Sequence, residues 1–362
     1  MDYEQKNPLP LPAVGSTEAV PCAFDTTFDW EYALKQSKLL TLYEKGKTAT
    51  WNASDLDWSI NVDIEGRAAR NTSRGTHEMV NQLLDPPHPM DAKQAIEFDV
   101  NMTAWMLSQF LHGEQGALVA SAKIAMAAPT EEAKFYAANQ TADEARHVEV
   151  YHRYLTEKLG RSFEINPHLQ TLLNQIVTDS RWDMTYLGMQ IMVEGLALAA
   201  FGIMKMELAD EPLIQDITHR IMQDEARHVA FGVLSLEHIY THELSSSELK
   251  EREDFVIEAT YLMRDRLLME QVYERMDFDV KVWTEWAKQT PFMVGFRQML
   301  FSKIVPNLKR LGLLTDRVRK EYEKIGILQF ENLKDSTEDA DIEAPAELVE
   351  LLDKIGAGTQ AA

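Results

Sequence analysis

Four long stretches of this chain carry the pattern of apolar and polar positions expected of α-helices. They lie at about residues 91–127, 131–159, 167–209 and 211–243. Residues that favour helix ends mark their boundaries: Thr130 and Glu131 open the second, Gly160 closes it, and Pro167 and Pro212 open the third and fourth. The stretches are rich in Ala, Met, Leu and Glu and poor in β-branched runs. We therefore predict an all-α fold with no strand.

Shorter helical patterns flank these four. We expect helices at about 29–47, 246–277, 280–288 and 291–312, the first with Trp30, Leu34, Leu42 and Tyr43 among its apolar positions. Residues 51–89 are mixed and end in a proline-rich break at 85–89. We divide the chain into an extended or disordered proline-rich arm (1–25), a helical domain (26–330) and an acidic tail (331–362) with a short helix at 344–355.

Composition narrows the class of protein. The 362 residues are 45% hydrophobic and 26% charged, which are ordinary globular values, and the formal net charge of −22 argues against a nucleic-acid partner. A single cysteine, Cys22, and an N-terminus without the pattern of a secretory signal lead us to expect a cytoplasmic protein. Residues 187–204 have the length of a membrane span, but Gln190 and Glu194 lie near their middle. A buried core helix is therefore favoured over a membrane helix.

One pentapeptide, Asp-Glu-Ala-Arg-His, occurs twice, at 143–147 and 224–228. Positions i and i+3 share one face of a helix, so Glu144 with His147, and Glu225 with His228, can each bind one metal ion. A single Glu-x-x-His is weak evidence, and Glu149 with His152 supplies one that points elsewhere around its helix. The alternative is two solvated faces with salt bridges, but apolar residues flank both pentapeptides and favour a buried site.

Two further carboxylates complete a four-helix pattern. Glu194 lies within an apolar helix, where an unpaired charge is costly, and Glu114 lies within the 91–127 helix. The steps from Glu114 to Glu144, Glu194 and Glu225 are 30, 50 and 31 residues, which suits two helical hairpins joined by a longer crossover. Two Glu-x-x-His helices plus one Glu from each of two others is the ligand pattern of ferritin-like di-metal bundles.

Four carboxylates and two imidazoles suit iron, with manganese possible in one or both positions, better than copper or a closed zinc site. Two such metals can bind O2 and deliver two electrons, and Glu194 and Glu225 are the carboxylates expected to shift between terminal and bridging positions. Asp143 and Asp224 are expected to accept the free ring N–H of His228 and His147, although a plain surface acid is the alternative for each. Arg146 and Arg227 would neutralise these acids from outside.

Glu114, Glu144 with His147, Glu194, and Glu225 with His228 together resemble the di-iron carboxylate oxidoreductases of the ferritin-like superfamily. That group includes multicomponent monooxygenase hydroxylases, ring epoxidases acting on CoA thioesters, acyl-carrier desaturases and the small subunit of class I ribonucleotide reductase. The resemblance covers about residues 91–243 and is specific for the superfamily rather than for one member. It implies a ferritin-like four-helix bundle with additional flanking helices and two iron ions.

Departures from these families narrow the expected chemistry. Monooxygenases and desaturases carry a threonine one turn after the third-helix glutamate, where this chain has Ala197 and Leu198. Aryl-amine N-oxygenases carry an extra histidine where this chain has Ile221. Tyr151 stands where the reductase small subunit keeps its radical tyrosine, with a core aromatic as the equal alternative. We expect Glu114, Glu194 and Tyr151 to take part in the chemistry.

Glycines recur beside the lone glutamates, at Gly188, Gly195 and Gly202 and at Gly113 and Gly116. Close helix packing and free space beside the metals are both compatible with them. Residues one or two turns from Glu114 and Glu194 would line such a space and favour a hydrophobic substrate. These residues are Phe110, Leu118, Gln190, Leu198 and Phe201.

The leading functional prediction is an O2-activating di-iron oxygenase or oxidase. It would act on a small organic substrate, receive electrons from a separate reductase or ferredoxin, and form a homodimer. One alternative is a radical-generating subunit like that of ribonucleotide reductase, with the acidic tail docking a larger partner. The other is a non-enzymatic ferritin-like iron-binding protein.

Overall fold

The regular secondary structure of the protein is helical throughout the residues that a computed structural model describes, which are 18–73, 81 and 84–338. The chain is all-α, as its sequence predicts. The expected tail helix at 344–355 and residues 1–17 of the predicted arm lie outside the described residues. The helices are α1 (Ser37–Thr48), α2 (Ile64–Ser73), α4 (Ala92–Ala127), α5 (Glu131–Arg153), α6 (Pro167–Thr178), α7 (Trp182–Tyr186), α8 (Glu194–Glu207), α9 (Pro212–His238), α10 (Ser246–Asp265), α11 (Glu270–Arg275), α12 (Val280–Gln289), α13 (Pro291–Met299), α14 (Val305–Arg310) and α15 (Asp316–Lys324).

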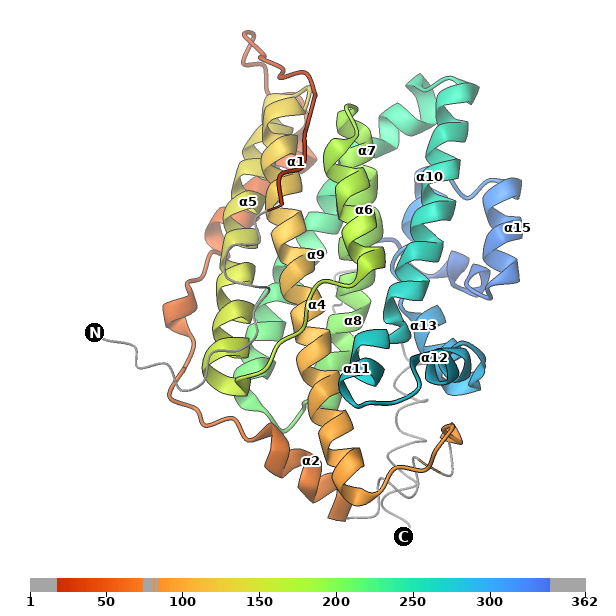
Figure 1. The fold of residues 1–362 in the computed structure, drawn as a ribbon. Helices are drawn as coiled ribbons and strands as arrows, with labels where there is room; N and C mark the ends of the chain where they lie inside the picture. The colour runs from red at the N-terminus through yellow and green to blue at the C-terminus, as the bar shows by residue number, and fades with distance from the viewer. Residues whose placement is uncertain (1–17, 74–80, 82–83, 339–362) are drawn as a thin grey trace.

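A ferritin-like four-helix bundle forms the centre of the molecule (Figure 1). Its members are α4, α5, α9 and the continuous run from α7 to α8. The helix α4 packs along α5, α8 packs along α9, and α5 also contacts α9. Each lone-glutamate helix is therefore paired with a Glu-x-x-His helix, in the two hairpins that the residue spacing predicts.

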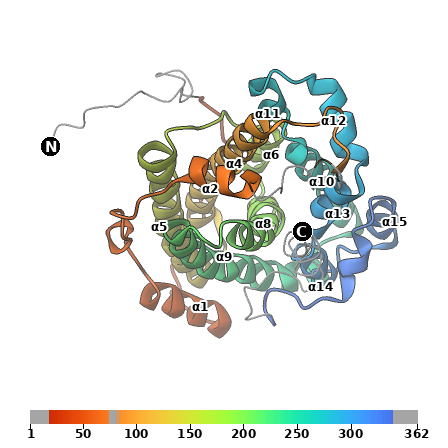
Figure 2. The same ribbon diagram turned by 90° about the horizontal axis from the view of Figure 1, so that it is seen from below.

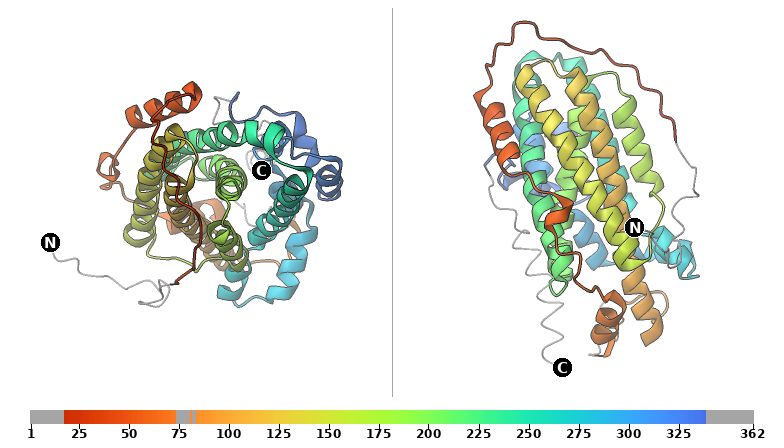
Figure 3. Two further views of the ribbon diagram at one scale, coloured as in Figure 1. Left: turned by 90° about the horizontal axis from the view of Figure 1, so that it is seen from above. Right: turned by 90° about the vertical axis from the view of Figure 1, so that its left-hand side faces the viewer.

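The remaining helices surround this bundle (Figures 2 and 3). On one side α1 packs against α5 and α9, and α2 packs against α4. On another side α6 and α10 pack against the α7–α8 run, and among the helices that follow α10, α11 contacts α4 and α14 contacts α9. Before α1, residues 18–36 contain no helix and pass over the outside of the bundle, where the Thr27 N–H donates to the Met126 carbonyl at 3.1 Å.

The bundle helices begin where the sequence carries capping residues. Asp91 accepts a hydrogen bond from the Gln94 N–H, and the Gln94 side chain accepts one from the Asp91 N–H. Thr130 caps α5 by accepting from the Ala133 N–H, and Pro212 occupies the first turn of α9. The predicted starts of these helices at 91, 131 and 211 therefore agree with the structure to within one residue.

The predicted single helix at 167–209 is wrong, because the chain breaks between α6 and α7. Asp179 ends α6 in an extended conformation, and its carboxylate accepts hydrogen bonds from the Arg181 backbone and guanidinium. A short acidic side chain that satisfies nearby donors competes with helical hydrogen bonding. The break makes α6 a flanking helix and leaves the α7–α8 run as the third member of the bundle.

Three other predicted helices differ in extent. The helix expected at 29–47 begins only at Ser37, because Glu132 accepts hydrogen bonds from the N–H groups of Lys35 and Gln36 and holds this segment extended. The 246–277 helix is interrupted at Met269, which adopts a left-handed conformation (φ 55°). Residues 300–304 likewise separate α13 from α14 within the predicted 291–312 helix.

Bundle helices contain π-helical segments, at Tyr154–Leu159 after α5, Leu187–Val193 between α7 and α8, and Ile239–Glu243 after α9. A π-helical turn holds one more residue than an α-helical turn and therefore rotates everything that follows it. The segment Leu187–Val193 ends directly before Glu194. It therefore sets the direction in which Glu194 points.

The run Trp182–Glu207 is the one helix in the described part of the chain that is long and apolar enough to cross a membrane. Its most apolar window is 94% buried inside the molecule. It is therefore packed as the core helix of a soluble protein is, as the polar Gln190 and Glu194 predict.

Candidate metal centre

The six predicted metal ligands meet in the middle of the bundle. Glu114 comes from α4, Glu144 and His147 from α5, Glu194 from α8, and Glu225 and His228 from α9. All six side chains are buried, the most exposed being Glu114 at 5%. Burying an isolated charge costs roughly several kcal/mol, so a buried cluster of four carboxylates needs a compensating cation.

The two histidines present the same ring nitrogen to the carboxylates. Nδ1 of His147 lies 3.1 Å from Glu114 Oε2, 3.2 Å from Glu144 Oε2 and 3.3 Å from Glu225 Oε1. Nδ1 of His228 lies 3.1 Å from Glu144 Oε1 and 3.5 Å from Glu225 Oε1. The two imidazole rings are 6.0 Å apart, centre to centre, with Glu144 and Glu225 reaching both.

The ligand atoms form two overlapping groups, each with all its atoms within 4.8 Å of one another. One contains Glu114, Glu144, His147 and Glu225, and the other contains Glu144, Glu194 and His228. Each group can hold a metal ion. The ligand that both groups share is Glu144, whereas the sequence led us to expect Glu194 and Glu225 as the bridging carboxylates. Glu225 does approach both histidines. Glu194 belongs to one group only.

Several of these atoms are buried without a hydrogen-bond partner. They include Glu144 Oε2, Glu194 Oε2, both carboxylate oxygens of Glu225, and His228 Nδ1. His228 Nδ1 lies close to Glu144 Oε1, yet the pair lacks the geometry of a hydrogen bond. Lone pairs that converge on a common space rather than on donors suit a pair of metal ions, so the residues present fit such a centre.

The outer nitrogens of the histidines contact acids from the opposite pentapeptide. His147 Nε2 lies 3.2 Å from Asp224 Oδ2, and His228 Nε2 lies 3.3 Å from Asp143 Oδ2. These contacts favour a ring with Nε2 protonated and Nδ1 free to bind metal. Arg146 and Arg227 each donate to the acid three residues before them, Asp143 and Asp224.

Two residues that sequence reasoning missed complete this network. The Trp51 indole N–H donates to Asp224 Oδ2 at 2.8 Å, which extends the chain of contacts from His147 to the segment before α2. Gln140, one turn before Glu144, donates to Glu144 Oε1 at 3.0 Å and to Glu194 Oε1 at 2.9 Å. The spacing of Gln140 and Glu144 on α5 was a usable signal, but nothing in the mixed segment 51–89 marked Trp51.

Burial raises the pKa of the Glu114 and Glu194 carboxyls well above their usual range, and the neighbouring Glu225 and Glu144 charges raise them further. Burial would also raise the pKa of Glu144, but the two histidines outweigh it and hold that pKa well below its usual range. For His147 and His228, burial opposes protonation, yet the surrounding carboxylates raise both pKa values well above the ordinary value of 6.5. Without metal, the cluster therefore keeps protons that metal ions must displace.

The other Glu-x-x-His pair, Glu149 and His152, is exposed on the far face of α5, as its position in the sequence predicts.

A narrow cavity of about 20 Å³ adjoins the metal centre, which is room for about one water molecule. It is lined by Glu114, Glu194, Glu225 and the predicted Phe110 and Phe201, together with Gln109, Gly113, Ala117, Val193, Ala197 and Arg266. Three residues expected beside the substrate do not line this cavity: Leu118 is half-buried, Leu198 is buried elsewhere, and Gln190 contacts Gln140 at 3.4 Å.

Tyr151 is fully buried beside this cavity and packs against the rings of Phe110 and Phe201. Its hydroxyl has no hydrogen-bond partner. Burial and the nearby Glu114 charge raise its pKa well above 10.0, so the phenol stays protonated.

Some of the glycines allow close helix packing, and one leaves free space beside the metal centre. A Cβ at Gly188 would lie 2.4 Å from Ile176 Cγ1, and one at Gly116 would lie 2.5 Å from Leu173 Cδ2, so these glycines allow close helix packing. Gly195 is less tight, at 3.1 Å from Ile304 Cγ1. A Cβ at Gly113 would meet nothing within 4 Å. Gly113 alone of these four leaves free space beside the metal centre.

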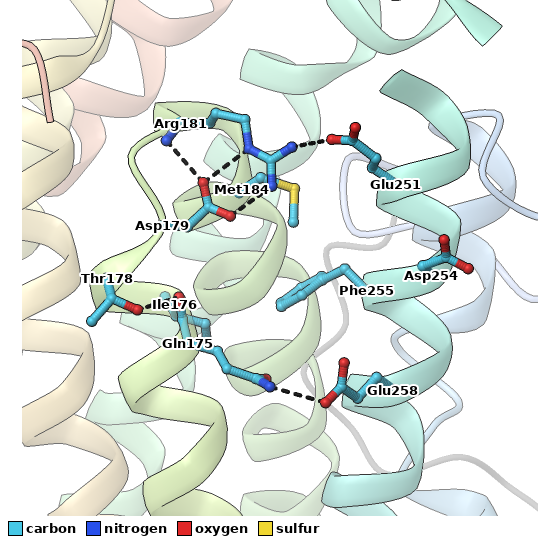
Figure 4. Close-up of a pocket in the computed structure, with 10 residues that line it drawn as sticks. All are labelled: Gln175, Ile176, Thr178, Asp179, Arg181, Met184, Glu251, Asp254, Phe255 and Glu258. Carbon is cyan, nitrogen blue, oxygen red and sulfur yellow. Dashed lines mark hydrogen bonds and ion pairs between the residues drawn. The ribbon is translucent and has the colours of Figure 1, made fainter. Parts of the chain in front are cut away.

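A larger hollow of about 470 Å³ lies between α6 and α10, away from the six ligands (Figure 4). Its rim is polar, with Arg181 bound to Asp179 and Glu251, and Gln175 bound to Glu258 at 2.9 Å. None of the six candidate ligands is among the residues that line it. We therefore assign the chemistry to the buried centre.

No model of a known protein family matches the chain, and a search of curated proteins finds no relative.

Proposed function

We propose that this protein is an O2-activating di-iron oxidoreductase, an oxygenase or oxidase that acts on a small, hydrophobic organic substrate. The observation that carries the proposal is the pair of buried ligand groups that share Glu144. Four carboxylates and two imidazoles, without a cysteine among them, suit iron or manganese better than the cysteine-rich sets of structural zinc sites. When bound, two such ions supply two-electron reduction of O2.

The chain's own residues have separable tasks in this proposal. Glu144 and Glu225 span the two histidines and hold the two metal positions together. Asp143 and Asp224 fix the ring orientation of the histidines, and Gln140 holds Glu144 and Glu194 in place. The aromatic rings of Phe110, Tyr151 and Phe201 keep bulk water away from the cavity beside Glu114 and Glu194.

Electrons come from a separate reductase or ferredoxin in this proposal, because the sequence carries no flavin or iron–sulfur motif. The acidic surface implied by the net charge of −22 suits docking to a more basic donor. We also propose a cytoplasmic homodimer as the working form.

The direct test is to load the metal-free chain with Fe(II) under anaerobic conditions and then expose it to O2. We expect about two iron ions per chain and oxidation of the iron on a far shorter timescale than in buffer. Glu144→Ala together with Glu225→Ala should abolish both. If this double variant binds as much iron as the native chain, the ligand assignment is wrong.

The exposed pair Glu149 and His152 offers a matched control for this experiment. Glu149→Ala together with His152→Ala removes the same residue types from α5 and should leave the iron content unchanged. Iron content far above two per chain would instead favour the ferritin-like iron-binding alternative.

Tyr151 favours a second candidate, a radical-generating subunit. Its phenol is buried against Phe110 and Phe201, which line the cavity, and among the described residues it has no hydrogen-bond partner. Electron paramagnetic resonance after O2 exposure separates the two functions: a tyrosyl signal that Tyr151→Phe removes supports the second, and product from a fed substrate without that signal supports the first.

A further inference from the structure

Arg266 is a buried cation that does not belong to the groups of candidate metal ligands. It follows α10 in the short 3₁₀ segment Arg266–Leu268, and its residue is 4% exposed. Its side chain lines the same cavity as Glu114, Glu194 and Glu225. Within the described part of the chain, its guanidinium forms no hydrogen bond or ion pair, and Nη1 is fully buried without a partner.

Other buried arginines of this protein show how such a side chain is normally satisfied. Arg252 forms a two-pronged pair with Asp183, at 2.9 and 3.0 Å. Arg297 donates to the carbonyls of Met293 and Ala287, at 3.2 and 3.1 Å. Arg266 has neither kind of partner, although leaving a buried charge unpaired is strongly destabilising.

The Arg266 side chain nevertheless remains charged. Burial lowers its pKa to about 10, and no carboxylate opposes that shift. At neutral pH the wall of the cavity therefore contains a cation, together with apolar residues, the amide of Gln109 and the metal-site carboxylates. The missing partner is an anion that residues 18–73, 81 and 84–338 do not supply.

We propose that Arg266 binds the carboxylate of a small organic ligand, whose apolar part occupies the cavity that Phe110 and Phe201 line. A guanidinium presents two parallel N–H donors that match the two oxygens of a carboxylate. Phe110, Phe201, Ala117 and Val193 provide apolar walls, and Glu114, Glu194 and Glu225 line the same cavity. If the proposed function holds, this ligand is the substrate, held by its carboxylate with its apolar part toward the metals.

The present size of the cavity limits the ligand. About 20 Å³ admits a water molecule, so a ligand with a carbon chain must displace side chains. The Phe110 and Phe201 rings pack edge to face against each other in the cavity wall, with their centres 4.6 Å apart, and Gly113 borders the cavity with nothing within 4 Å of its Cβ position. A slender, short-chain monocarboxylate fits this description better than a bulky or doubly charged anion.

The test uses acetate, butyrate and hexanoate as probes, with 1-butanol, 1-hexanol and inorganic phosphate as comparisons. Binding is measured by calorimetry on the full chain, once metal-free and once metal-loaded. We expect butyrate or hexanoate to bind, the alcohols to bind at least about tenfold more weakly, and Arg266→Gln to lose a similar factor. Arg264→Gln, a more exposed arginine on the same stretch that pairs with Asp265, should leave the affinity unchanged.

Two further variants separate recognition from folding. Arg266→Met should raise the thermal midpoint of the ligand-free chain, because it removes an unpaired buried charge; a lowered midpoint would instead show a structural role and contradict the proposal. Gly113→Val points a side chain into free space, so it should preserve folding and metal content while weakening hexanoate binding.

The outcomes distinguish this inference from the proposed function. If the native chain holds two metals but no carboxylate binds, or if Arg266→Gln binds carboxylates as tightly as the native chain, the inference fails and the metal centre stands. A carboxylate that binds only to the metal ions would bind to Arg266→Gln as tightly as to the native chain, and this result also contradicts the inference. If no metal is held but carboxylate binding still depends on Arg266, the proposed function fails and the Arg266 site stands. Phosphate binding equal to that of butyrate would overturn the carboxylate assignment in favour of a general anion site.

Discussion

Glu144 and Glu194 are both buried metal-ligand candidates, but they are not equivalent. The Glu144 carboxylate faces both histidines, whereas Glu194 contributes to the group of His228 only. Removing each should therefore have a different effect on the number of metal ions held.

We expect Glu194→Ala to retain about one metal ion per chain and Glu144→Ala to retain fewer, because the second change removes a ligand from both positions. Metal analysis after dialysis against a weak chelator measures the ratio. Equal losses in the two variants would show that the two positions fill only together.

At this scale the sequence predicted the centre well where residues repeat and poorly where they stand alone. The duplicated pentapeptide pointed to four of the residues that the structure brings together, and the apolar helix around Glu194 pointed to a fifth, because a lone charge there needs compensation. Trp51 and Arg266 escaped notice because they reach the centre from segments far away in sequence. Only tertiary packing brings such side chains together.

Helix starts were predictable and helix interruptions were not. Caps and prolines act on their own helix, so the beginnings of α4, α5 and α9 follow from a few local residues. The break at Asp179 depends on Arg181, which also binds Glu251 of α10, and the π-helical segment Leu187–Val193 leaves no mark in the apolar pattern. The predicted continuous helix at 167–209 failed for that reason.

The glycines of the bundle provide a test of packing between elements. Gly188→Ala should lower the free energy of unfolding by roughly 1–3 kcal/mol, because its methyl group would meet Ile176, which α6 holds in place. Gly113→Ala should be neutral or should add up to about 1 kcal/mol, since it meets no atom and alanine favours a helix. Urea unfolding of both variants makes the comparison, and an equal loss in both would contradict the assigned roles.

Without metal, the buried carboxyl and imidazole groups of the centre hold more protons in the folded molecule than in the unfolded chain. The pKa values of Glu114 and Glu194 are raised above the ordinary 4.5 by burial and neighbouring carboxylates, and those of His147 and His228 are raised above 6.5 by the surrounding carboxylates. Between the ordinary and the raised values, the native state holds more protons than the unfolded chain. Its free energy of unfolding must therefore fall as pH rises.

We expect the metal-free chain to lose stability as pH rises above the ordinary pKa values of these groups, and the stabilisation by metal to grow in the same direction because metal displaces those protons. The lowered pKa of Glu144 acts in the opposite sense, but only below its ordinary value of 4.5. Urea midpoints at several pH values, with chelator and with Fe(II) under anaerobic conditions, measure both slopes. Glu114→Gln should flatten the metal-free slope, and an unchanged slope in that variant would show that other groups cause it.

The shared position of Glu144 between two ligand groups also bears on the life of the chain in a cell. Without metal, the buried acidic cluster lowers the stability of the native state, so a larger fraction of the chains is unfolded at any time. When unfolding and refolding are fast, the rate of degradation by proteases follows this unfolded fraction. The supply of the metal would then set how much of this protein persists. Cells that lack the metal would degrade the empty chain, and a surplus would let the chain accumulate at a constant rate of synthesis.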